Sequence, residues 1–135
     1  MKKLTVNWLS AATLLALTPA ALAAEAPKVG VYESYSQVAF DAAKDQQRVL
    51  FFAASWCPNC RAADADIMAK LSQIPAKVVI FKTDYDKELA LKKKYGITAQ
   101  HTFVLVDADG KALKKWAGGG LKQIISKTEQ TAPAQ

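Results

Sequence analysis

The chain has 135 residues, a formal net charge of +6, two cysteines and one histidine. So few potential ligands exclude a disulfide-rich scaffold and a structural zinc site, which normally takes four cysteine or histidine ligands. The lysine runs at 92–94 and 114–115 are typical of solvated faces. The charge therefore specifies no partner, and nucleic acid is not expected as one.

The first 23 residues are typical of a cleaved secretory signal peptide. Lys2 and Lys3 precede an apolar run over residues 4–17, and Ala21-Leu22-Ala23 gives the small-x-small pattern of a cleavage site. Polar residues interrupt the run, which argues against a permanent membrane span of ~20 apolar residues; an uncleaved anchor is the alternative. Cleavage would leave one domain, residues 24–135, with a charge of +4. We therefore expect a periplasmic or secreted protein, in surroundings where disulfides persist.

Apolar runs and turn residues predict alternating strands and helices after residue 28. In chain order we expect a brief strand at 29–31, a helix at 36–46, a strand at 48–54, a helix at 58–71, a strand at 77–83, a helix at 86–95, a strand at 102–106, a turn at 107–110, a strand at 111–117 and a helix after the glycines 118–120 to about residue 127. This order predicts an α/β fold with a central mixed sheet and helices on both faces.

End signals and inward faces are also predicted. Ser36 is expected to cap the first helix, and Gly96 to end the third. In the helix at 58–71, the expected inward residues are Ala62, Ala65, Ala69, Met68 and Leu71.

The segment Trp56-Cys57-Pro58-Asn59-Cys60 carries the clearest chemical signal. Two cysteines three residues apart, at the start of a predicted helix, form a pair that cycles between dithiol and disulfide. The helix N-terminus favours the thiolate of Cys57, which is then the attacking sulfur, while Cys60 resolves the mixed disulfide. Pro58 suits the first helical turn, and Trp56 supplies an apolar wall. A purely structural disulfide across so short a loop would stabilise little, so the redox interpretation is favoured.

Residues 51–61 resemble the active-site strand, turn and helix start of the thioredoxin superfamily, and the order of elements over about 29–127 is similar to its fold. The resemblance implies a thiol–disulfide oxidoreductase that acts on protein disulfides without a cofactor. It implies a monomer recycled by a partner redox protein. Pro58-Asn59 matches neither the Gly-Pro of reducing thioredoxins nor the Pro-His of strongly oxidising relatives, so we expect an intermediate reduction potential.

His101 departs from the family pattern. Counting from Tyr95 places Gln100-His101-Thr102 on the loop that faces the active site, with His101 where most relatives carry a cis-proline. The Gln100–His101 bond is expected to be trans, because a cis bond before a non-proline residue costs about 3 kcal/mol.

Three roles stay open for His101. It tunes or shuttles protons for the thiols, it completes a copper(I) or zinc site with Cys57 and Cys60, or it merely fills the loop. If substrate docking limits the protein, we expect a His101→Pro change to raise general disulfide reductase activity.

A second departure concerns a buried acid. Thioredoxins carry an aspartate six residues before the first cysteine, where it helps deprotonate the resolving thiol, and this chain has Phe51 there. Lys82 matches the family's lysine beside that acid. The resemblance therefore implies that proton transfer at Cys60 uses water, Lys82 or His101.

Overall fold

The computed structural model describes residues 29–132, so the predicted signal peptide lies outside the described residues. The elements are β1 (Val31–Ser34), α1 (Gln37–Ala42), β2 (Gln47–Ala53), α2 (Pro58–Ala69), the 3-10 helix η1 (Leu71–Gln73), β3 (Val78–Asp84), α3 (Leu89–Tyr95), β4 (Thr102–Val106), β5 (Ala112–Ala117) and α4 (Leu121–Glu129). Each predicted strand and helix therefore has a counterpart.

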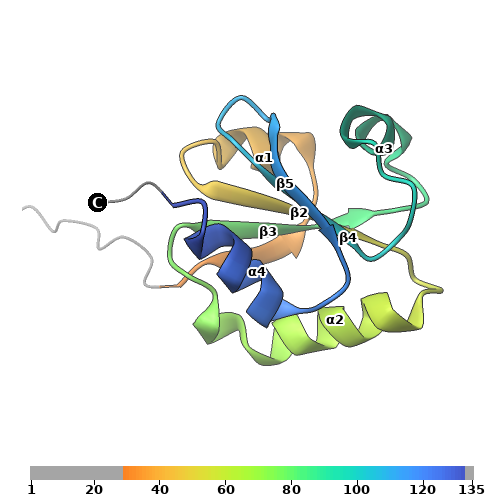
Figure 1. Cartoon of the computed structure of the whole chain (residues 1–135), viewed down its shortest axis with the longest axis horizontal. Helices are drawn as coiled ribbons and strands as arrows, with labels where there is room; N and C mark the ends of the chain where they lie inside the picture. Colours follow the sequence, from red (N-terminus) through yellow and green to blue (C-terminus); the bar gives the residue numbers. More distant parts are fainter. Residues whose placement is uncertain (1–28, 133–135) are drawn as a thin grey trace, which may run out of the picture.

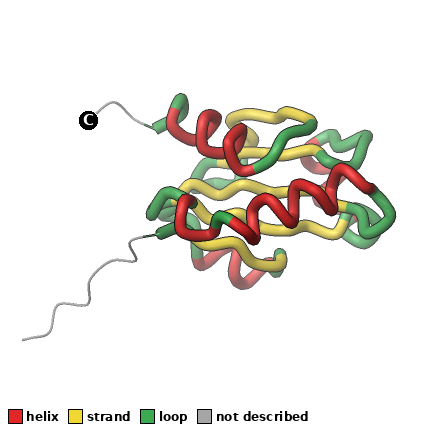
Figure 2. Tube along the Cα trace, turned by 90° about the horizontal axis from the view of Figure 1, so that it is seen from below, coloured by secondary structure: helices red, strands yellow, loops and turns green. Residues whose placement is uncertain are grey.

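Within residues 29–132 the five strands form one sheet in the order β1-β3-β2-β4-β5. The first three run parallel, whereas β4 runs antiparallel to both β2 and β5. Figures 1 and 2 show the sheet between two layers of helices, with α2 and α4 on one face and α1 and α3 on the other. The predicted α/β fold with a central mixed sheet is confirmed.

Strand β2 lies at the centre of the sheet and is buried almost throughout. Because successive side chains of a strand point to opposite faces, Phe51 packs in the core beneath α2 and α4, and Phe52 in the core beneath α1 and α3. Both rings are fully buried. A continuous apolar run was therefore the correct signal for a strand covered on both faces.

The predicted end signals hold, although several helices are shorter than predicted. Ser36 caps α1 by accepting the Ala39 N–H (3.1 Å), and Gly96 ends α3 in the left-handed conformation with φ 61°. The predicted helix at 86–95 begins only at Leu89, because the Asp84 carboxylate accepts the backbone N–H groups of Asp86 and Lys87 and holds a turn there.

The predicted inward face of α2 is wrong. Cys60, Ala63 and Ile67 are buried, whereas Met68 is 55% and Leu71 39% exposed. Ala62, Ala65 and Ala69 are exposed as well. Spacings of three and four residues from Cys60 connect the buried set, so these residues share the side of the helix that faces the sheet.

Three aromatic rings stack across neighbouring strands below α2. Phe51 on β2 pairs with Phe103 on β4, and Phe103 with Trp116 on β5. The ring centroids are 4.5 Å and 5.4 Å apart, with interplanar angles of 10° and 12°. This stack fills the position of the family's buried aspartate with apolar surface, which leaves the core beneath the cysteines without an acid at that point.

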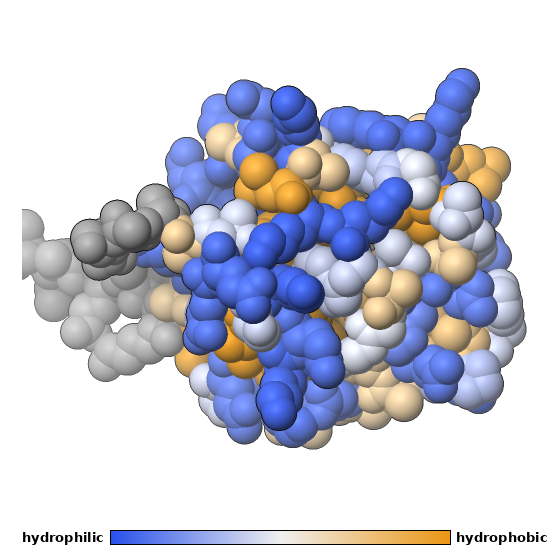
Figure 3. Space-filling model, in the orientation of Figure 1, coloured by the Kyte–Doolittle hydropathy of each residue, from blue (hydrophilic) through white to orange (hydrophobic). Residues whose placement is uncertain are grey.

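Hydrophilic residues cover most of the face shown in Figure 3, with apolar residues in small separate patches. No helix among residues 29–132 combines the length and the apolar character needed to cross a membrane.

Truncation of the central stack is expected to be costly. Phe51→Ala should lower the free energy of unfolding by about 3–5 kcal/mol, because it removes a fully buried ring and its partner Phe103 loses a stacking face. Denaturant unfolding followed by fluorescence measures the change. Val38→Ala, at a position 81% exposed, is the control and should change stability by less than about 0.5 kcal/mol. Equal effects of the two substitutions would contradict the assigned role of the stack.

Candidate active site

The two cysteines lie at the start of α2, next to the end of β2. Cys57 is the N-cap residue, with extended backbone (φ −87°, ψ 113°), and Pro58 occupies the first turn. The Cys57 sulfur accepts a hydrogen bond from the Cys60 backbone N–H (3.1 Å). A sulfur in this position faces the unpaired N–H groups and the positive end of the helix dipole, which stabilise a negative charge on it. The sulfurs are not joined in a disulfide.

The Cys60 thiol is held in a dry environment. Its residue is 1% exposed. Burial, followed by its hydrogen bond and charge interaction with Cys57, raises the pKa of the Cys60 thiol to about 11, although hydrogen bonds from the backbone of Ala54 and His101 work in the opposite direction. The thiol is therefore protonated at neutral pH, and any reaction in which Cys60 acts as a nucleophile requires that its proton be removed first.

The carbonyl groups at the end of β2 hold the loops of the site. Phe52 O accepts the His101 N–H (2.8 Å), and Ala54 O accepts the Cys57 N–H (3.2 Å). The His101 loop and the cysteine turn are thus fixed to the same strand end, and His101 packs its ring against Phe51 and Phe103.

His101 has an unusual backbone. Residues 29–132 contain no cis peptide bond, so the Gln100–His101 bond is trans as predicted, and His101 has φ 57°, a conformation that L-residues rarely adopt. Its Nε2 lies 2.8 Å from the Gly119 carbonyl oxygen. Because a carbonyl only accepts, Nε2 carries the proton and the ring is anchored to the glycine loop.

This anchoring does not assemble the alternative metal site. Within residues 29–132 no group of three or more histidine, cysteine, aspartate or glutamate side chains is arranged to hold a metal ion. Cys57 and Cys60 lie together, but the Nε2 atom of His101 is engaged by Gly119. The geometry gives the three-ligand hypothesis no support.

The remaining predicted residues surround the pair. Trp56 is 56% exposed, and its Nε1–H donates to the Asp86 carboxylate (3.0 Å). Thr102 is buried and donates to Ala99 O (2.8 Å). Asn59 lines a groove that we call the His101 groove. The groove is lined by Asn59, Ala62, Ala63, Asp66, His101 and Gly118–Gly120.

One helical turn beyond Cys60, the predicted site residue Lys82 joins two residues that the sequence did not nominate, Asp64 and Tyr32. Asp64 on α2 accepts a hydrogen bond from the Tyr32 hydroxyl (2.5 Å) and pairs with Lys82 Nζ (2.8 Å). Partial burial pushes the pKa of the Asp64 carboxyl upward, but the hydrogen bonds from Lys82 and Tyr32 and the charge of Lys82 outweigh it and hold this pKa below its ordinary value. The sequence signal that could have found Asp64 was its spacing of four residues from Cys60.

The comparison with known proteins agrees with the fold. The thioredoxin family model matches residues 31–130. The chain belongs to the thioredoxin family. Thioredoxin H4 of Arabidopsis thaliana is 30% identical over 92 residues, which cover 67% of this chain and 76% of the relative. An H-type thioredoxin of Brassica campestris is 35% identical over 88 residues, covering 64% and 70%. The X-ray structure of Fasciola hepatica thioredoxin superposes with a TM-score of 0.60 and 27% identity, covering 70% of this chain and 89% of that one.

Family membership establishes the general activity and corrects one prediction. The thioredoxin homologues identify the protein as a thiol–disulfide oxidoreductase. The predicted periplasmic or secreted localisation is wrong, because the matched relatives are plant H-type and fruit-fly thioredoxins, which are not exported. The prediction rested only on the composition of a short N-terminal segment, with lysines, an apolar run and alanines, and such a composition is weakly specific.

The backbone at His101 weighs against a gain of activity from proline there. His101→Pro requires φ near −65° in place of 57° and removes the N–H that Phe52 O accepts. We expect a loss of about 2 kcal/mol or more in the free energy of unfolding and no increase in disulfide reduction.

Denaturant unfolding and a protein-disulfide reduction assay measure both effects of this change. His101→Gly is the matched control, since glycine keeps the N–H and tolerates a positive φ, so its stability loss should be smaller. A His101→Pro variant that is as stable as the parent and more active in disulfide reduction would contradict this prediction.

The raised pKa of Cys60 predicts a pH-dependent stability. Because the folded state favours the neutral thiol, its stabilising contribution is fully present below pH 9.0 and is lost as the pH rises through about 11. Under reducing conditions, the free energy of unfolding of the parent should fall by on the order of 2 kcal/mol more than that of Cys60→Ser between these two pH values. Unfolding by denaturant at a series of pH values measures the difference. A difference that stays constant with pH would show that folding does not perturb the Cys60 thiol.

Proposed function

We propose that Cys57 and Cys60 are the redox pair through which this protein acts on protein disulfides. The observation that carries the proposal is the position of Cys57 at the N-cap of α2, where its sulfur accepts the Cys60 N–H. Cys57 attacks a substrate disulfide, forming a mixed disulfide and releasing one substrate thiolate. Cys60 then attacks the Cys57 sulfur and releases the second thiolate. The substrate gains the two electrons that the dithiol loses.

The surrounding residues are proposed to shape the site rather than to react. Trp56 offers an exposed aromatic face, and Pro58 and Asn59 form the exposed turn between the sulfurs. His101 holds the loop that faces the pair, because its N–H is bound to β2 and its ring to Gly119. Thr102 supports that loop from within.

The proposed partners follow from this chemistry. The substrates are proteins with disulfides or thiols that reach the surface between Trp56 and the His101 groove, and a second redox protein restores the pair after each turnover. We propose that the protein acts as a monomer, without a cofactor and without nucleic acid. Its redox unit is residues 24–135, with a core at about 29–127, which agrees with the extent of the family match.

Substitution of each cysteine separates the two roles. Cys57→Ser should abolish reduction of the disulfides of insulin, because no attacking sulfur remains. Cys60→Ser should still attack but stop at the mixed disulfide, which non-reducing electrophoresis and mass spectrometry detect as a covalent adduct at Cys57. An adduct that forms at residue 60 in Cys57→Ser at the same rate would reverse the assignment.

The reduction potential is expected to be intermediate. With Pro58-Asn59 between the cysteines, we expect a value between about −270 mV and about −120 mV, the values of thioredoxin and of a strongly oxidising relative. Equilibration in graded thiol buffers, followed by alkylation and mass spectrometry, measures the potential of the purified protein. A pair that does not cycle reversibly would remove the proposed function.

A further inference from the structure

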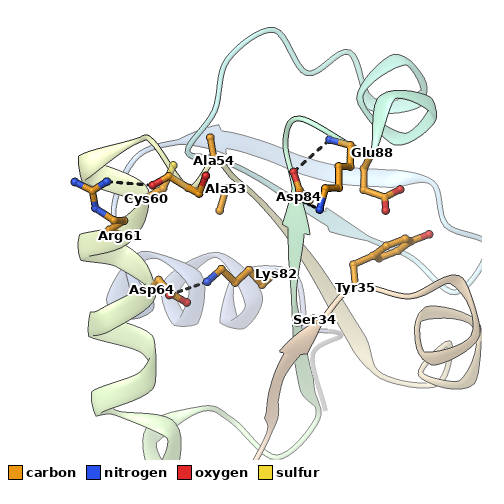
Figure 4. Close-up of a pocket in the computed structure, with 12 residues that line it drawn as sticks. Ser34, Tyr35, Ala53, Ala54, Cys60, Arg61, Asp64, Lys82, Asp84 and Glu88 are labelled. Carbon is orange, nitrogen blue, oxygen red and sulfur yellow. Dashed lines mark hydrogen bonds and ion pairs between the residues drawn. The ribbon is translucent and has the colours of Figure 1, made fainter.

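The resolving step needs a destination for the Cys60 proton, and the structure provides a pocket beside this residue. Cys60 forms part of the wall of a pocket of about 400 Å³, which we call the Asp64 pocket. Figure 4 shows Cys60 and Asp64 one above the other on α2, with Lys82 reaching from β3 toward Asp64. A spacing of four residues on a helix places the two Cβ atoms about 5–6 Å apart.

The groups around this pocket come from every element that borders it. They are Arg61 and Asp64 on α2, Tyr35 after β1, Lys82 and Asp84 on β3, and Lys87 and Glu88 in the turn that follows. Asp84 belongs to the opposite wall, where it pairs with Lys87 and accepts backbone N–H groups of its own turn. Of the acids that line this pocket, Asp64 is the one on the same helix as Cys60.

Neighbouring groups other than Asp64 are poorly suited to accept the proton. Lys82 is a donor to Asp64, and an ammonium group has no lone pair. His101 lines the His101 groove and is not among the residues that line the Asp64 pocket. Phe51 fills the position of the family's buried acid and stands in register with Lys82, so Lys82 finds its carboxylate on α2 instead.

Asp64 is held in the form that accepts a proton. Lys82 and Tyr32 both donate to its oxygens, and these two contacts anchor the carboxylate to β1 and β3 at the same time. Because the pKa of Asp64 lies below its ordinary value, the group is ionised at neutral pH. The same contacts make it a weaker base, so it takes the proton only as the Cys60 sulfur forms its bond to Cys57.

We propose that Asp64 is the proton acceptor for Cys60 in the resolving step, an inference that rests on the proposed roles of the two cysteines. The Cys60 S–H proton passes across the pocket to the Asp64 carboxylate as the Cys60 sulfur attacks the Cys57 sulfur. The bond between Cys57 and the substrate sulfur breaks, and the substrate leaves as a thiolate. Asp64 then returns the proton to the solvent that reaches the pocket.

The mixed disulfide itself favours this transfer. Part of the rise in the pKa of the Cys60 thiol comes from its hydrogen bond and charge interaction with Cys57. Once Cys57 is bonded to a substrate sulfur it carries no negative charge, so this part disappears and burial alone remains to oppose ionisation. Proton removal is therefore easiest at the stage of the reaction where it is needed.

The reaction of the reduced protein with Ellman's reagent separates the two steps. Attack by Cys57 releases one thionitrobenzoate, and resolution by Cys60 releases a second, so stopped-flow absorbance resolves two phases. In Asp64→Asn the second phase should slow by about ten-fold or more at pH 7, while the first phase keeps its rate. The deficit should shrink as the pH rises, because Cys60 then ionises without help.

Two further variants make the result specific. Asp64→Glu restores a carboxylate and should recover most of the second-phase rate. Asp84→Asn removes an acid from the opposite wall of the same pocket and should leave both phases unchanged. A second phase in Asp64→Asn with the parent's rate and pH profile would overturn the assignment of Asp64. Failure of the parent to form a Cys57–Cys60 disulfide in this reaction, detected by mass spectrometry, would instead overturn the proposed roles of Cys57 and Cys60.

Discussion

The end of the central strand β2 is the constraint on which the active site depends. Hydrogen bonds from β3 and β4 fix the strand along both edges, and its last carbonyls hold the surrounding loops. Phe52 O binds His101 N–H, Ala53 O binds Tyr85 N–H, and Ala54 O binds Cys57 N–H. The segments that contain Cys57, Tyr85 and His101 are therefore bound to three consecutive residues, 52–54. The cysteine pair is thus positioned by the central strand of the sheet, which is buried almost throughout.

Burial at this strand end also determines where polar chemistry takes place. The stack of Phe51, Phe103 and Trp116 excludes a charged group from the core below the cysteines. The Cys60 thiol is consequently buried, and an ion pair lies further along the same helix, where Asp64 meets Lys82 and Tyr32. Because Phe51 offers Lys82 no carboxylate, Lys82 pairs with Asp64 on α2 instead.

The order of elements was predictable because it is a signal carried by neighbouring residues. Continuous apolar runs identified the buried strands, and the cysteine spacing identified the chemistry. The inward face of α2 was predicted wrongly, because alanines surround the helix and offer no strong periodicity; contact with the sheet selects Cys60, Ala63 and Ile67. The predicted location failed because an N-terminal composition pattern is weakly specific.

The sequence by itself determined the strand–helix order, the pair at Cys57 and Cys60, and the absence of a proline at residue 101, since each depends on adjacent residues. Only the tertiary structure decided that His101 turns its Nε2 atom to Gly119 and that Asp64 joins Lys82 and Tyr32. These contacts span 18 to 32 residues of sequence. The first contact forms because β4 pairs with β5, and the other two form because the sheet order places β1 and β3 beneath α2. No local pattern encodes either proximity.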